Sequence, residues 1–191
     1  RPRSGAGFDS GRIELNGKAA EAAAQRRACR RGKGGPGVGM ELRSLADVAA
    51  FRVDQTQRFH SATHEEIAAG ATADIYFVKT LQVLRHLGLE EKRVTAEIFP
   101  RRGGVLAGVE EVRQLLEGKG VEVWALPEGA EFGPKEVVMR IEGPYGRFGL
   151  YETALLGMLA SATGWATAAR EVKDAAGDKP VVCFGARHVH P

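Results

Sequence analysis

"YETALLGMLASATGWATAARE", residues 151–171, and "PVVCFGARHVHP", residues 180–191, are the two stretches that decide the fold of this chain. The first reads as two helical runs crowded with small residues, which let a helix lie very close to a neighbour or a ligand. The second opens with a short apolar run, typical of a buried strand in a parallel sheet. Arg187 and His188 follow that run, at the strand end where parallel α/β proteins bind ligands.

Length and composition describe an ordinary globular chain. Its 191 residues are enough for one domain or slightly more, with 43% hydrophobic and 27% charged residues. No apolar run approaches the ~20 residues that span a bilayer, and no signal-peptide pattern follows the basic opening, so we expect no membrane partner. The two cysteines, Cys29 and Cys183, cannot form a disulfide framework and favour a reducing, cytoplasmic compartment.

The net charge of +3 comes from the start of the chain. Residues 1–39 hold nine Lys or Arg and three Asp or Glu, which leaves 18 basic and 21 acidic residues in 40–191. The main support for nucleic-acid binding is thereby lost, and no nucleic acid is expected as a partner. Residues 1–39 lack any sustained period and are expected to be a disordered basic leader. Because Met40 opens the first patterned segment, we interpret the leader as non-native; the alternative is a true basic arm.

Residues 40–147 alternate helical and strand patterns and predict an α/β sandwich domain. Residues 148–191 are expected to be a helical connection into the first strand of a second, incomplete α/β unit. The expected helices are 41–51, one capped by Ser61 or Thr63, one from Thr72 or Asp74 to about Leu87, and one with Val109, Val112 and Leu116 facing inward. The expected strands are 93–100, 121–129 and 134–144, besides the C-terminal one.

Two groups of residues could carry chemistry on pattern alone. Arg187 offers a fork of donors for a carboxylate or phosphate, or it pairs with a neighbouring acid. His188 and His190 alternate and would face opposite ways along a strand, which argues against a metal site. Asp74 and Tyr76 fall in the first turn of a helix, where backbone N–H groups favour anions. As patterns, these two residues are a cap and a core aromatic.

Three further positions are weaker candidates. Phe184 is a core residue by default. Thr167 bonds back to its own helix as readily as it contacts a ligand. Glu152, in the first turn of a helix, is interpreted as a solvated side chain.

Taken together, these residues resemble the nicotinate phosphoribosyltransferase family and, more broadly, the type II phosphoribosyltransferases, which include quinolinate phosphoribosyltransferase. The similarity runs from about Phe59 to Pro191, and residues 1–39 have no part in it. "YETALLG", "ATGWAT" and "ARHVHP" match the ERxxLN, SGIAT and TRKTxPG segments of the quinolinate enzymes. "ADIY" and "FGAR" match the TDxY and FGxR segments of the nicotinate and nicotinamide enzymes, with Ala73 in place of threonine.

The departures from the quinolinate pattern bear on the substrate. Thr153 stands where the quinolinate enzymes have an arginine, and His188 stands where they have a lysine. Quinolinate has two carboxylates, and the loss of a cation at Thr153 removes a partner for one of them. A substrate with one carboxylate, nicotinate, therefore fits better.

The resemblance implies a nicotinate phosphoribosyltransferase that makes nicotinate mononucleotide and pyrophosphate from nicotinate and phosphoribosyl pyrophosphate, in NAD salvage. It implies ATP hydrolysis with magnesium, and a homodimer or higher homo-oligomer with a shared active site. It also implies the residue roles, with the pyridine ring held between aromatic side chains of two subunits. Those roles are ring stacking by Tyr76 and Phe184, carboxylate or phosphate binding by Arg187, a place beside the phosphoribosyl group for His188, and substrate contacts for Asp74 and Thr167.

Other readings stay open. The protein could be a quinolinate or nicotinamide phosphoribosyltransferase, or a non-catalytic small-molecule-binding or dimerisation module. In the family, residues 180–184 belong to the first strand of an α/β barrel. A single strand cannot close a barrel, so we expect Val181 and Val182 to lie open and this chain by itself to be inactive.

Overall fold

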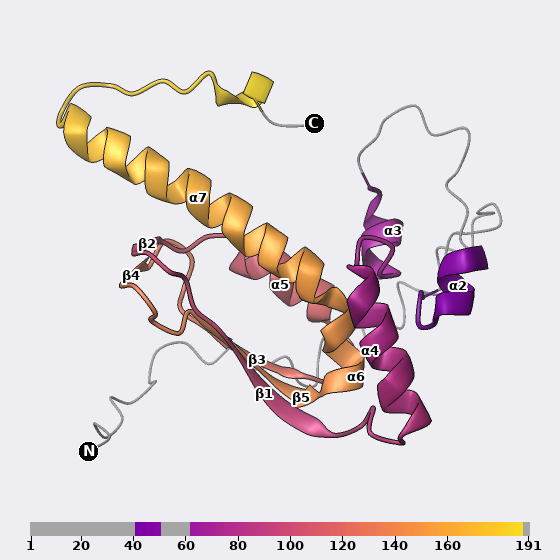
Figure 1. Ribbon diagram of the computed structural model, residues 1–191. Helices are drawn as coiled ribbons and strands as arrows, with labels where there is room; N and C mark the ends of the chain where they lie inside the picture. The colour runs from indigo at the N-terminus through magenta and orange to yellow at the C-terminus, as the bar shows by residue number, and fades with distance from the viewer. Residues whose placement is uncertain (1–40, 51–61, 189–191) are drawn as a thin grey trace, which may run out of the picture.

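The computed structural model describes residues 41–50 and 62–188 of the chain. Its elements form two layers, a small antiparallel sheet and helices packed on one face of it (Figure 1). The predictions for the leader and for His190 lie outside the described residues. In chain order the elements are α2 (Leu45–Ala50), α3 (His64–Ala68), α4 (Ile75–His86), β1 (Arg93–Ile98), β2 (Gly104–Val105), α5 (Val109–Leu116), β3 (Glu122–Ala125), β4 (Glu131–Phe132), β5 (Met139–Pro144), α6 (Tyr145–Phe148), the 3-10 turn η1 (Gly149–Tyr151), α7 (Glu152–Ala176) and the 3-10 turn η2 (Gly185–His188).

The main sheet has the strand order β1-β5-β3, with both pairs antiparallel. Ile141 lies in the middle of it, opposite Ala96 on one side and Val123 on the other. All three strands were predicted, the first of them from its alternating pattern, and all three are confirmed. The two-residue strands β2 and β4 pair separately, and no sequence pattern predicted them because strands this short carry no period.

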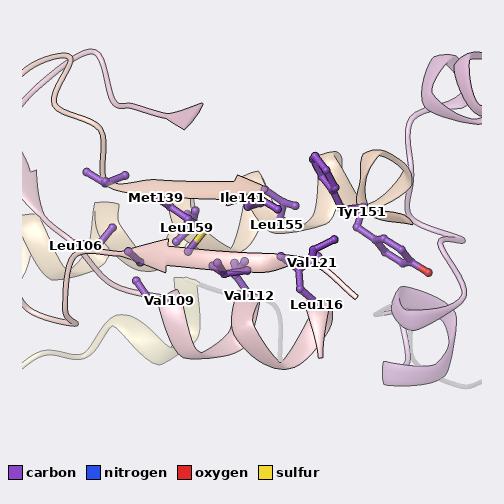
Figure 2. Packing of buried hydrophobic residues seen from close by; sticks show 14 of the residues in the cluster. Leu106, Val109, Val112, Leu116, Val121, Met139, Ile141, Tyr151, Leu155 and Leu159 are labelled. Carbon is purple, nitrogen blue, oxygen red and sulfur yellow. The ribbon is translucent and has the colours of Figure 1, made fainter. Parts of the chain in front are cut away.

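One face of the sheet is buried under helices, and this is where the core lies. Met139 and Ile141 of β5 pack with Val112 of α5 and with Leu155 and Leu159 of α7 (Figure 2). Met139 and Val112 have 0% exposed surface, and the other three are buried. Burial of one such side chain contributes about 1.5–3 kcal/mol, so this face supplies most of the stability. The inward positions predicted for α5 are confirmed.

The opposite face of the sheet carries charged pairs. Arg140 lies 2.6 Å from Glu97, and Arg93 lies 3.3 Å from Glu122. Exposed pairs of this kind contribute at most about 1 kcal/mol each. The contrast between an apolar and a charged face makes this a two-layer α/β sandwich, the fold class that the sequence predicted.

The helix caps settle two alternatives that the sequence left open. Thr63, rather than Ser61, caps α3 in a capping box with Glu66, whose backbone N–H donates to the threonine hydroxyl at 3.2 Å. Asp74, rather than Thr72, caps α4. Its side chain accepts the backbone N–H of Tyr76 at 3.2 Å.

The two helical runs predicted after Tyr151 are one continuous helix, the 25-residue α7, and that detail of the prediction is wrong. Gly157 and Gly164 lie inside the helix, and a Cβ on either would meet nothing within 4 Å. The predicted close approach does occur, and the neighbour is the loop around Gly104 and Gly108. A Cβ on Gly108 would lie 3.0 Å from the carbonyl oxygen of Met158. None of the helices in the described residues is both long and apolar enough to cross a bilayer.

Residues 180–184 do not form the buried strand that their apolar composition predicted. Val182 is 74% exposed, Phe184 is 72% exposed, and the thiol-bearing Cys183 is exposed as well. A strand needs a neighbouring strand for its backbone hydrogen bonds, and this segment pairs with no strand among the described residues. Val181, at 42% exposed, and Val182 do lie open, as expected.

The contact between α7 and the loop around Gly104 and Gly108 can be tested with two substitutions that are expected to change stability in opposite directions. Gly108 has φ of +91°, in the left-handed region, and little room for a Cβ. Gly108→Ala is therefore expected to lower the free energy of unfolding by about 2–4 kcal/mol, from backbone strain plus overpacking. Chemical denaturation measures this change.

Gly164→Ala is the matched control, because a Cβ there meets nothing within 4 Å. In a helix interior this change is expected to raise stability by about 0.5–1 kcal/mol. Equal effects at the two glycines would contradict the packing described here.

Candidate functional site

Apart from Thr167, the predicted site residues fall into two groups, which lie at different points along α7. The first is the α4–α7 junction, defined as Asp74, Tyr76, Tyr145, Glu152 and Thr153. Its central contact joins residues 79 positions apart: the backbone N–H of Asp74 donates to the hydroxyl of Thr153 at 3.0 Å. The first turn of α7 thus holds the first turn of α4.

Tyr76 is not the core aromatic that the pattern alone indicated. Its side chain is 53% exposed, while the adjacent Phe77 is buried at 6%. The two ring centroids lie 4.0 Å apart. Phe77 anchors this end of α4 in the protein, and Tyr76 presents its ring at the surface, where a planar ligand could stack on it.

Beside the junction lies an open groove of about 330 Å³ between β1, α6 and α7. Glu152 is one of its few polar residues, and burial raises the pKa of its carboxyl group. Burial and the charge of Glu152 also raise the pKa values of Tyr76 and Tyr145. The residues that line the groove include Ile98, Phe99, Tyr145, Glu152, Leu155 and Leu156.

The sequence interpretation missed two members of this junction. Glu152 was expected to be solvated, but it is partly buried against apolar side chains. Tyr145 was not singled out at all. No local pattern could have found either residue, since the groove beside them is lined by residues that are far apart in the sequence.

The second group is the C-terminal segment, defined as residues 180–188, with Phe184 and Arg187 exposed and His188 ending η2. It folds back over α7, as Figure 1 shows. A Cβ on Gly185 would lie 2.9 Å from the ring of Trp165. Arg187 makes no ion pair with another described residue, so the alternative of a structural pair finds no support within 41–50 and 62–188.

The structure does not bring the two groups together within one chain. Thr153 marks the junction on α7 and Trp165 marks the C-terminal segment, so the two lie about 18 Å apart along the helix at 1.5 Å per residue. Thr167 is occupied elsewhere, because its hydroxyl accepts the backbone N–H of Val105 at 2.9 Å. Its predicted substrate contact stays a prediction.

Metal ligands do not gather in the part of the chain that the structure describes. No group of three or more His, Cys, Asp or Glu side chains there could hold a metal ion. The magnesium that the family resemblance implies stays a prediction.

Comparisons with known proteins agree with this architecture. Residues 74–163 match the family described as "Quinolinate phosphoribosyl transferase, N-terminal domain". Nicotinate phosphoribosyltransferase 2 of Arabidopsis thaliana is 42% identical over 73 residues, which are 38% of this chain and 13% of that protein.

The chain also resembles solved structures, including the following two. Nicotinate-nucleotide pyrophosphorylase from Pyrococcus furiosus is 50% identical with a TM-score of 0.68, over 71% of this chain and 36% of that chain. Human nicotinic acid phosphoribosyltransferase has a TM-score of 0.53 at 21% identity, over 56% of this chain and 29% of that chain. The human structure supports the fold alone.

The matches support a class: residues 74–163 match the N-terminal domain of the quinolinate phosphoribosyltransferases, and the Pyrococcus and Arabidopsis proteins resemble the chain in sequence. The matching family is named for quinolinate, whereas the relatives are named for nicotinate, nicotinic acid or nicotinate nucleotide. The chain spans about a third of the length of the Pyrococcus protein and 13% of the Arabidopsis protein. The matched family region contains the α4–α7 junction and ends before the C-terminal segment.

The partly buried carboxyl group of Glu152 predicts a pH-dependent stability. Its pKa is raised above the ordinary 4.5, so its contribution to stability is fully present below pH 4.5 and is lost as the pH rises through the folded-state pKa. Glu152→Gln is expected to raise the free energy of unfolding at pH 7 by no more than about 1 kcal/mol, since solvent still screens the site.

Denaturation at pH 7 and pH 4 measures this difference, which should shrink at the lower pH. Glu171→Gln, on the exposed part of α7, is the control for the loss of a charge alone. A destabilised Glu152→Gln variant at pH 7 would contradict the buried environment of this carboxyl group.

Proposed function

We propose that this chain is part of a nicotinate phosphoribosyltransferase of NAD biosynthesis. The reaction joins the ring nitrogen of nicotinate to C1 of phosphoribosyl pyrophosphate and expels pyrophosphate. The observation that carries the choice of substrate is at Thr153. The resemblance places an arginine there in the quinolinate enzymes, whereas here a neutral hydroxyl accepts the backbone N–H of Asp74. The position offers no cation to a second carboxylate.

The exposed groups suit a flat, singly charged ring. Tyr76 presents an aromatic face at one end of the domain, and the C-terminal segment presents Phe184 and the guanidinium of Arg187. An aromatic pair can hold a pyridine ring between two faces, and a guanidinium can bind its carboxylate through two hydrogen bonds. For a transition state with oxocarbenium character, the protein mainly needs to position the two reactants and to stabilise the developing charge.

In the proposed enzyme, the two groups meet between two copies of the chain. Within one chain about 18 Å of α7 separates them. A homodimer in which Tyr76 of one copy faces Phe184 and Arg187 of the other would complete the site. This arrangement is supported by the separation along α7 and by the exposure of all three side chains.

ATP and magnesium belong to the proposal only through the family resemblance. The described residues offer no cluster of metal ligands, and we assign neither group to any of them. His188 keeps its proposed place beside the phosphoribosyl group, and Asp74 and Thr167 keep theirs near the substrate.

The family description favours a second candidate, a quinolinate phosphoribosyltransferase. The two functions differ in the number of substrate carboxylates, so the pyridine itself separates them. Product formation by the full-length protein with nicotinate, quinolinate or nicotinamide as the sole acceptor is the direct comparison.

Arg187→Ala in the full-length protein is expected to lower kcat/KM for nicotinate by about 30- to 100-fold. This is the effect of losing a charge-assisted hydrogen bond to the carboxylate. Steady-state kinetics of nicotinate mononucleotide formation measures it.

Arg170→Ala is the matched control, because Arg170 is an exposed arginine of α7 whose partner is Glu131, at 2.7 Å. It should leave kcat/KM nearly unchanged. Near-normal transfer by Arg187→Ala, or preference of the wild-type protein for quinolinate, would count against the proposed function.

A further inference from the structure

Thr153 does more than lack the positive charge that the quinolinate enzymes have at this position. Its side chain also makes a specific contact with the start of α4. Its hydroxyl accepts the backbone N–H of Asp74 at 3.0 Å, across 79 residues of sequence. Asp74 is the N-cap of α4. The N–H groups at the start of a helix have no carbonyl partner within the helix, because each helical N–H bonds to a carbonyl four residues earlier. The hydroxyl of Thr153 thus satisfies a donor that the helix leaves open.

Two hydrogen bonds connect Thr153 to the backbone of Tyr76 through Asp74, and a third connects Asp74 to the backbone of Phe77. Thr153 accepts from the N–H of Asp74, the side chain of Asp74 accepts from the N–H of Tyr76 at 3.2 Å, and the carbonyl of Asp74 accepts from the N–H of Phe77 at 3.0 Å. Asp74 and Tyr76 are exposed, so buried packing does not fix them directly. These bonds tie the first turn of α4, which carries Tyr76, to Thr153 of α7.

The body of the protein holds both ends of the chain of bonds rigidly. Phe77 and Val78 of α4 are buried at 6% and 2%, and Leu155, two residues after Thr153, is buried at 2%. Thr153 therefore stands on a fixed part of α7. A rotation of the first turn of α4 would break its bond to Asp74.

We propose that Thr153 is a positioning residue, whose hydroxyl holds the cap of α4 so that the Tyr76 ring keeps the orientation needed to stack on the pyridine. The inference rests on the proposed function and deepens it. At this position a threonine, unlike an arginine, offers no positive charge to a second substrate carboxylate. The same threonine supports Tyr76, the aromatic residue proposed to stack on the pyridine ring.

The exposure of the hydrogen bond between Asp74 and Thr153 favours a positioning role for Thr153 over a role in global stability. An exposed hydrogen bond to one backbone N–H adds little to global stability. Its loss would instead loosen the few residues at the start of α4, since helix ends open locally at low cost.

Thr153→Ala in the full-length protein is expected to raise the KM for nicotinate roughly 3- to 10-fold, the effect of one neutral hydrogen bond, while kcat changes less than about twofold. Thr153→Ser keeps the hydroxyl and should restore the KM to near the wild-type value. Amide hydrogen exchange in residues 74–77 should be faster in Thr153→Ala than in Thr153→Ser.

Thr63→Ala is the matched control. It removes another threonine hydroxyl that accepts one backbone N–H, at the cap of α3, without contacting α4. It should leave the KM for nicotinate unchanged.

An unchanged KM in Thr153→Ala, or a Thr153→Ser variant as impaired as Thr153→Ala, would overturn the inference. If the wild-type protein transfers no phosphoribosyl group to nicotinate, the proposed function fails. Hydrogen exchange at residues 74–77 still tests the contact with Thr153 in that case.

Discussion

The packing of the first half of α7 on the apolar face of the sheet is the constraint on which the rest of the structure depends. Leu155 and Leu159 bury this half against β5, and Gly104 and Gly108 let the same helix lie directly on the loop before α5. Because α7 is one unbroken helix, its packing on the sheet also fixes the position of the segments that contact α7 elsewhere along its length. Its first turn holds the start of α4, and its middle supports the C-terminal segment.

This arrangement explains why the candidate site is divided. Tyr76 belongs to the end of the domain where α4 and α7 begin, while Phe184 and Arg187 belong to a segment that returns along α7 to Trp165. Their attachment points on α7, Thr153 and Trp165, lie about 18 Å apart along the helix in one chain. A second copy is the simplest way to bring an aromatic face opposite a guanidinium, which is why the proposed enzyme is a dimer.

Much of the fold could be predicted from the sequence, since it depends on local patterns. The spacing of Val109, Val112 and Leu116 has the helix period, and the alternation in β1 has the strand period, so both were confirmed. The site was less predictable. The surroundings of Glu152 come from tertiary packing, and the bond between Thr153 and Asp74 joins residues that no pattern connects. The strand predicted at 180–184 was wrong because a strand depends on partners, and the described residues supply none.

The most direct test of the proposed enzyme uses two defective copies of the full-length protein in one cell. One carries Tyr76→Ala and the other carries Arg187→Ala, and nicotinate mononucleotide formation is measured for each alone and for the co-expressed pair. In a two-fold symmetric dimer with shared sites, a mixed dimer has one intact site, so the account predicts that the pair regains about a quarter of wild-type activity while each variant alone has little. A pair no more active than the single variants would contradict it.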